Sequence, residues 1–173
     1  MSHWLDKTNS WLEIFKRKLA PVHKDLYVYL DKVIEESNLE FIDVQGCALS
    51  AARAVGYPVF VFAIEKEMGF ANEKNAASIA ASMASLNSSW INYLGSTKQN
   101  QLFFETPPDT IEPYGGTTEI KFNMYLLSAY VVYGTTTEIS RCTDLLKNHL
   151  TQQQIDDVAR IASVIHAAIK TQT

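Results

Sequence analysis

The residues that could do chemistry are few in this 173-residue chain, and most of them stand alone. There are two cysteines, Cys47 and Cys142, and four histidines. His3, His23 and His149 do not stand at metal-ligand spacing from a cysteine or from a cluster of carboxylates. Two cysteines also make no disulfide framework. The sequence therefore predicts neither a metal centre nor a bound cofactor.

The densest group of candidate site residues lies in the stretch from Lys121 to Lys147, KFNMYLLSAYVVYGTTTEISRCTDLLK. This stretch is typical of an apolar helix, a break around Gly134, and a second helix that begins among three threonines. Glu138 lies in the first turn of the second helix, where it could act as a general base or a metal ligand. A carboxylate in this place is also stabilised simply by the helix dipole, and we favour that interpretation.

Cys142 lies about one turn beyond Glu138, and two interpretations of it are open. It is either a lone reactive thiol or a small, half-buried residue, and the second is the commoner situation of a free cysteine. Cys47 falls on an apolar helix face and is predicted to be a core residue. Thr135 and Thr137 are predicted to cap the helix that carries Cys142.

The composition is that of one globular domain. The chain is 47% hydrophobic and 20% charged, and its length permits a sizeable core. A net charge of −4 and a pI of about 5.5 argue against a general nucleic-acid binder, which would carry a basic face. The chain shows no signal-peptide pattern and no apolar run long enough for a membrane span. We therefore expect a cytoplasmic protein with reduced thiols, bound to neither membrane nor nucleic acid.

Helical periodicity and helix-breaking residues predict an all-α chain. Gly56 and Pro58 separate two helices, because glycine can take the left-handed cap and proline cannot continue a helix. The segment after Pro58 is rich in β-branched and aromatic residues but lacks the alternation of a strand, so we expect a helix there. Asn72 and Thr151 are predicted N-caps. The expected helices cover residues 4–20, 21–37, 40–56, 58–69, 72–94, 121–133, 135–147 and 151–171.

Two parts of the chain match without a gap at an offset of 78 residues (127 − 49 = 78). Leu49–Ala51 matches Leu127–Ala129, and Gly56 falls on Gly134. Both copies have the pattern of a helix, a glycine break, a short helix and a long helix. This predicts two pseudo-symmetric units that bury their apolar faces on each other. The single predicted domain has an N-terminal helical extension (1–38), a first repeat (40–95), a loop (96–118) and a second repeat (119–171).

The duplicated unit resembles the AhpD-like alkylhydroperoxidase family, which is related to the carboxymuconolactone decarboxylases. Four segments in order carry the resemblance, over about residues 40–171: LSAARAVGYPVFVFAIEKEM, AASIAASMASLNSSWINYL, KFNMYLLSAYVVYG and IDDVARIASVIHAAI. The resemblance implies an AhpD-like helical bundle that assembles into trimers or hexamers. It also implies an antioxidant activity with a peroxiredoxin as partner.

In that family the redox site is a Cys-x-x-Cys pair at the start of the helix after the second-repeat glycine. At the matching positions, Thr135 and Glu138 replace the two cysteines. Thr137 replaces the histidine between them, and Cys142 replaces a later histidine. Asn123 stands where the family has a glutamate on the preceding helix. Because no pair of thiols is present to attack a peroxide and resolve the product, the two-cysteine cycle is not expected here.

Two functions of different classes follow from this comparison. The first is a catalytically degenerate AhpD-like protein, a pseudoenzyme kept for binding or scaffolding, whose former site is lined by Asn123, Thr135 and Thr137. The alternative is an active peroxide-reducing enzyme that uses Cys142 as its single cysteine, with Glu138 beside it. The decarboxylase branch does not need the cysteine pair, but no residue of this chain positively supports that chemistry.

Overall fold

The computed structural model describes residues 10–19, 23–95 and 113–172, and the regular structure in these ranges is helical throughout. A short 3₁₀ turn, η2 (Pro113–Gly116), precedes the second half of the chain. The α-helices are α1 (Trp11–Lys18), α2 (Lys24–Glu35), α3 (Phe41–Val55), α4 (Pro58–Glu67), α5 (Ala71–Gly95), α6 (Glu119–Tyr133), α7 (Thr136–Leu146) and α8 (Gln152–Lys170).

This architecture confirms the predicted all-α class. The segment after Pro58 is a helix and not a strand, as expected. The helix predicted over residues 4–20 is found from Trp11 to Lys18, while its beginning and most of the predicted loop 96–118 lie outside the described residues. No helix within the described ranges has the length and apolar character needed to cross a membrane.

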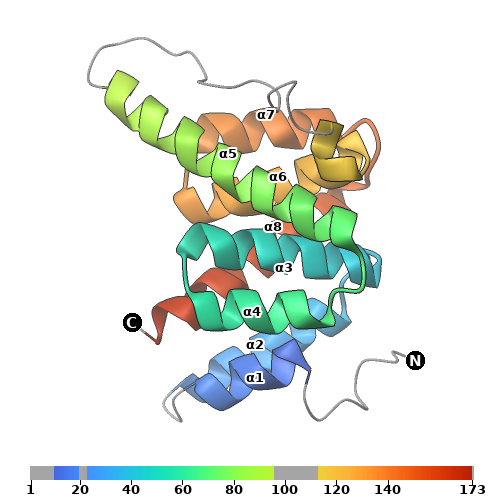
Figure 1. Cartoon of the computed structure of the whole chain (residues 1–173), viewed down its shortest axis with the longest axis vertical. Coiled ribbons are helices and arrows are strands. Elements are labelled where there is room, and N and C mark those ends of the chain that lie inside the picture. The colour runs from blue at the N-terminus through green and yellow to red at the C-terminus, as the bar shows by residue number, and fades with distance from the viewer. Residues whose placement is uncertain (1–9, 20–22, 96–112, 173) are drawn as a thin grey trace.

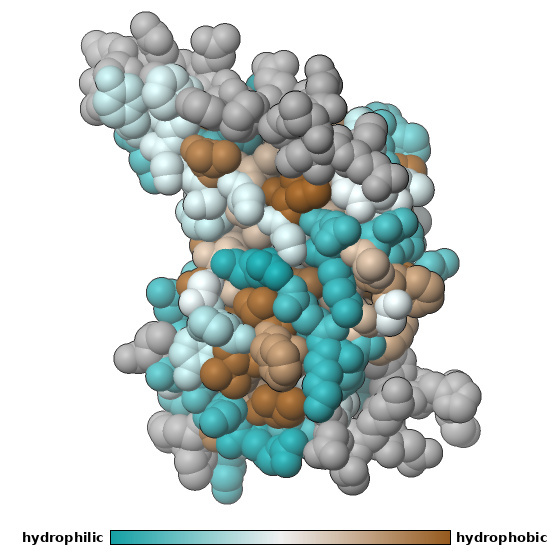
Figure 2. Space-filling view, viewed as in Figure 1, coloured by the Kyte–Doolittle hydropathy of each residue, from teal (hydrophilic) through white to brown (hydrophobic). Residues whose placement is uncertain are grey.

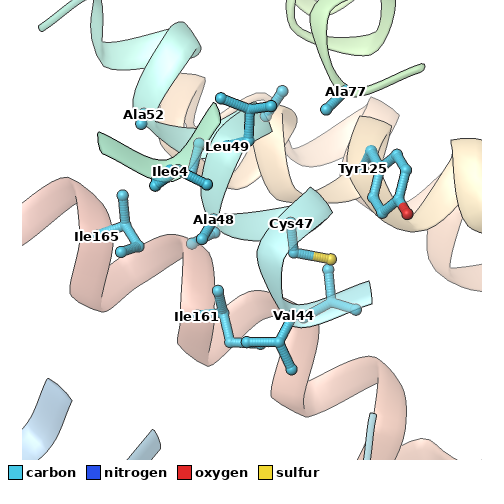
Figure 3. Packing of buried hydrophobic residues seen from close by; sticks show 14 of the residues in the cluster. Val44, Cys47, Ala48, Leu49, Ala52, Ile64, Ala77, Tyr125, Ile161 and Ile165 are labelled. Atoms are coloured by element: carbon cyan, nitrogen blue, oxygen red, sulfur yellow. The ribbon is translucent and has the colours of Figure 1, made fainter. Parts of the chain in front are cut away.

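Helices α3 and α6 form the centre of the molecule (Figure 1). They pack against each other, and each also packs against both of the longest helices, α5 and α8. Helix α4 lies on α3, and α7 lies on α6. Figure 3 shows Val44 and Ala48 of α3 beside Ile161 and Ile165 of α8 in this core. Helix α5 can approach closely because its buried face is mainly alanine: Ala76, Ala77, Ala80 and Ala84.

The contact between α3 and α6 carries two reciprocal hydrogen bonds. The Ser50 hydroxyl donates to the Tyr125 carbonyl, and the Ser128 hydroxyl donates to the Cys47 carbonyl, both at 2.7 Å. Both serines are fully buried. A Cβ placed on Gly46 would lie 2.2 Å from Cε1 of the Tyr125 ring. The crossing therefore depends on the absence of a side chain in α3 where a large one from α6 lies.

Three of the predicted helix ends are confirmed. Gly56 and Gly134 end α3 and α6 in the left-handed conformation, with φ of 84° and 70°. A side chain with a Cβ is strained in that conformation, which is why glycine stands at both ends. Thr151 is the N-cap of α8, and it forms a capping box with Gln154.

The predicted N-cap of α5 is wrong. Helix α5 begins at Ala71, so Asn72 lies inside its first turn. The Asn72 side chain donates from Nδ2 to the Gly116 carbonyl at 3.0 Å instead of capping its own helix. A contact with a turn 44 residues away in the sequence therefore occupies the amide that local preference assigns to the cap.

The N-terminal helices share the same core. Phe15 of α1 stacks on Phe60 of α4 with ring centroids 3.7 Å apart, and both side chains are fully buried. Helix α2 packs along α8. After α2, Asn38 donates from its backbone N–H and from Nδ2 to Oδ2 of Asp157 in α8, at 2.8 and 2.9 Å. The N-terminal extension is thus attached to both halves of the bundle.

Candidate functional site

The turn between α6 and α7 places Thr135 at the N-cap of α7, but its side chain makes no capping hydrogen bond. Its Oγ1 is buried and has no hydrogen-bond partner among the described residues. Thr137 is exposed within the first turn of α7. Thr135 therefore takes the predicted N-cap position without making the capping hydrogen bond, and the prediction that Thr137 caps the helix is wrong because Thr137 lies inside it.

Glu138 lies in the first turn of α7, as predicted, but it is buried. The residue is 3% exposed, and its Oε2 has no hydrogen-bond partner in the described part of the chain. Burial raises the pKa of Glu138 and outweighs the opposing influence of its own backbone N–H and of Arg141. Burial thus makes ionisation of this carboxyl, and with it a metal-ligand role, less favourable than for an exposed glutamate.

Cys142 follows Glu138 by about one helical turn and is 5% exposed. Burial raises the pKa of the Cys142 thiol to about 12, and the nearby Glu138 carboxyl contributes to the rise. The thiolate is the nucleophilic form, so a thiol with this pKa stays protonated and unreactive near neutral pH. Of the two interpretations of Cys142, the geometry favours the buried residue over the reactive thiol.

Two further residues join Glu138 and Cys142 at this place. Asn87 of α5 donates from Nδ2 to the Tyr130 hydroxyl of α6 at 2.7 Å, and both residues are buried. Burial raises the pKa of Tyr130 to about 12, and Cys142 and Glu138 add to the rise in their ionised forms. Asn87, Tyr130, Glu138 and Cys142 thus form one buried polar cluster between α5, α6 and α7.

Sequence reasoning missed Asn87 and Tyr130, although a signal for Asn87 was present. Asn87 continues the buried alanine face of α5, three residues after Ala84, so a polar side chain stands where the helix period expects an apolar one. A polar residue on a buried face needs a partner, and this partner is Tyr130. Nothing local in the sequence distinguishes Tyr130 from the other aromatic residues of α6.

The other sequence candidates lie outside this buried polar cluster. Asn123 is buried on α6, and its Nδ2 donates to the Glu119 carbonyl at 2.8 Å, within the same helix. Seven residues, about 10 Å of helix, separate Asn123 from Tyr130. Cys47 is a fully buried core residue, as predicted, and both cysteines are free. Within the described ranges, no three histidine, cysteine or carboxylate side chains gather as a metal site would require.

The molecule also has an open cleft of about 610 Å³ between α4 and α5, which sequence reasoning did not foresee. Residues at the end of α3 and Tyr133 at the end of α6 also line it. Figure 2 shows this face, where hydrophobic and hydrophilic residues are intermixed and the outline is hollowed on one side. The cleft is lined by Arg53, Gly56, Pro58, Val61, Phe62, Glu65, Ser78, Ala81, Ser82, Ser85, Leu86 and Tyr133.

Within the cleft, Arg53 and Glu65 form an ion pair between Nη2 and Oε1 that joins α3 to α4. The Arg53 and Glu65 side chains are 35% and 29% exposed, so solvent can reach the pair. Phe62 and Leu86 in the same cleft are 68% and 47% exposed. The cleft therefore offers both a charged and an apolar surface to a molecule in solution.

No model of a known protein family matches this chain, and no curated protein matches its sequence.

Proposed function

We propose that this chain is a catalytically degenerate AhpD-like protein, in which the helical frame of the family is kept for binding and the thiol chemistry has been lost. The observation that carries the proposal is the environment of Cys142. Its thiol is buried beside the Glu138 carboxyl, with a pKa of about 12. A cysteine in these surroundings does not supply the thiolate that peroxide reduction needs.

The reciprocal hydrogen bonds between α3 and α6 support the two-repeat organisation on which the resemblance rests. The donors Ser50 and Ser128 are 78 positions apart (128 − 50), and so are the two acceptors, Cys47 and Tyr125 (125 − 47). This is the offset at which the two sequence segments match. A pseudo-two-fold axis between α3 and α6 would exchange the two hydrogen bonds and would exchange α4 with α7 and α5 with α8.

The same surroundings argue against the alternative function, a single-cysteine peroxidase. Peroxide would have to reach a sulfur atom in a residue that is 5% exposed. The neighbouring Glu138 would disfavour the thiolate, whereas reactive cysteines are found beside cations or helix N-termini. A peroxiredoxin partner would require thiol exchange with this chain, so it is not part of the proposal.

A binding role is supported by the cleft between α4 and α5. Its volume of about 610 Å³ lies within the range of about 300–1,000 Å³ found for small-molecule sites. Self-association, which the resemblance implies as trimers or hexamers, fits the exposed apolar residues Val28 and Tyr29 on α2.

Peroxide turnover with a dithiol reductant tests the proposal. Hydrogen peroxide and an organic hydroperoxide would be offered to the wild type, to Cys142→Ser and to Cys47→Ser. We expect all three proteins to consume peroxide no faster than the reductant alone. Robust turnover by the wild type that disappears in Cys142→Ser would overturn the proposal. Turnover that survives in a variant carrying both substitutions would overturn it too, because it would reveal catalysis without thiols.

A further inference from the structure

We propose that the cleft between α4 and α5 binds a small zwitterionic amphiphile, namely a free α-amino acid with a large apolar side chain. This inference rests on the proposed function only in taking binding as the role of the chain. It uses none of the residues of the buried polar cluster, so the two proposals can fail separately.

The cleft carries a positive and a negative charge next to each other. Arg53 lies in the last turn of α3 and Glu65 near the end of α4, and the two are ion-paired. A guanidinium has several N–H donors and a carboxylate has several lone pairs, so each group keeps capacity for a second partner. Because the pair is partly exposed, little stability is lost when its geometry adjusts to a ligand.

Charge complementarity favours a ligand that carries both a positive and a negative group. A ligand with only a carboxylate would gain from Arg53 and be repelled by Glu65, and an amine would meet the opposite problem. An α-amino acid places its carboxylate and its ammonium on the same carbon. It can therefore face Arg53 with one group and Glu65 with the other, which specifies a zwitterion over either singly charged analogue.

The apolar surface begins directly beside this pair. Phe62 precedes Glu65 by three residues, so the two side chains are neighbours on the surface of α4. Phe62 is 68% exposed and Leu86 is 47% exposed, and both line the cleft. A large apolar side chain of the ligand would cover them while its charged groups remain at Arg53 and Glu65.

The size of the cleft, about 610 Å³, leaves room for such a molecule. Helices α4 and α5, which both line it, diverge from the short connection between them (Figure 1). Apart from Leu86, the α5 residues that line the cleft are small. Two of these, Ser78 and Ser82, donate their hydroxyl protons to helix carbonyls at 2.8 and 3.0 Å, so each hydroxyl oxygen is free to accept from a ligand.

Isothermal titration of the full chain with three probes tests the proposal. The probes are L-phenylalanine, 3-phenylpropanoate and 2-phenylethylamine, which share the ring and differ in charge. We expect saturable binding of L-phenylalanine that is about tenfold or more tighter than that of either singly charged probe, as for the loss of a charge-assisted hydrogen bond. Failure of L-phenylalanine to bind at millimolar concentrations, or equal affinities for all three probes, would overturn the proposal.

Substitutions locate the binding. Arg53→Met and Glu65→Gln should each reduce the affinity for L-phenylalanine to that of a singly charged probe, and Phe62→Ser should weaken the binding of all three. Lys66→Gln is the matched control, because Lys66 is exposed on α4 and does not line the cleft. Binding that is unaffected by all three cleft substitutions would refute this site. If L-phenylalanine does not bind, the peroxide assay still tests the proposed function separately.

Discussion

At the scale of single residues, the buried polar cluster places chemically capable side chains in surroundings that disfavour their charged forms. Asn87 satisfies the Tyr130 hydroxyl, whereas Oε2 of Glu138 and Oγ1 of Thr135 are buried without a partner among the described residues. A buried polar group without a hydrogen bond costs about 1–3 kcal/mol. Burial also raises the pKa values of Glu138 and Cys142, and the value of about 12 for the Cys142 thiol keeps that group protonated near neutral pH.

The Glu138 carboxyl should make the stability of the protein depend on pH. Its pKa is raised in the folded state, so the folded protein binds the proton more tightly than the unfolded chain does. The stabilisation that comes from the protonated Glu138 carboxyl is fully present below the pKa of the unfolded chain, about 4.3. It is lost as the pH rises through the pKa of Glu138 in the folded protein. Glu138→Gln removes the titration. We expect the free energy of unfolding of the variant to exceed that of the wild type by about 1–3 kcal/mol at pH 7 and by less at pH 4.

Urea unfolding of both proteins at the two pH values measures this difference. Asp144→Asn is the matched control, because Asp144 lies on the same helix with a 66% exposed side chain. The difference in free energy of unfolding between Asp144→Asn and the wild type should be similar at the two pH values. A difference between Glu138→Gln and the wild type that is the same at pH 4 and pH 7 would contradict the raised pKa.

At the scale of the helices, the two serines at the α3–α6 crossing should contribute equally if the halves are pseudo-symmetric. Each of Ser50→Ala and Ser128→Ala leaves a buried carbonyl without its hydroxyl donor, at a cost of about 1–3 kcal/mol. The control is Ser163→Ala, whose exposed hydroxyl donates to the Ala159 carbonyl and whose loss should change stability by less than about 0.5 kcal/mol. Chemical denaturation of the three variants would show clearly unequal effects of Ser50→Ala and Ser128→Ala if the pseudo-symmetry is wrong.

Helix positions could be predicted from the sequence where the determining residues are local. Gly56, Gly134 and Thr151 mark helix ends through their own backbone or side-chain chemistry, and all three are found as predicted. The prediction of an N-cap at Asn72 is wrong because the Asn72 amide donates to the Gly116 carbonyl. No local sequence pattern connects these two residues. Thr135 takes the N-cap position as predicted, but its hydroxyl is buried and makes no capping hydrogen bond, which local preference does not reveal.

At the scale of the whole molecule, the sequence revealed only part of each site. Glu138 and Cys142 stand near each other in the chain, and both belong to the buried polar cluster. Asn87 and Tyr130 come from other helices, so their participation follows from how α5, α6 and α7 pack. The cleft likewise depends on the angle between α4 and α5 and on Tyr133 at the end of α6. Such angles are set by tertiary packing, which residue spacing does not specify.

The central claim, that the native fold makes the Cys142 thiol inert, is tested most directly by its alkylation rate. Iodoacetamide would be applied over a range of pH to the native protein and to the urea-unfolded chain, and peptide mass mapping would separate Cys142 from Cys47. With a folded pKa of about 12, the native thiol should react about a hundredfold or more slowly than the unfolded one at pH 8. The rate should rise only as the protein unfolds. Rapid alkylation of Cys142 in the native protein, with an apparent pKa below that of a free thiol, would contradict the account.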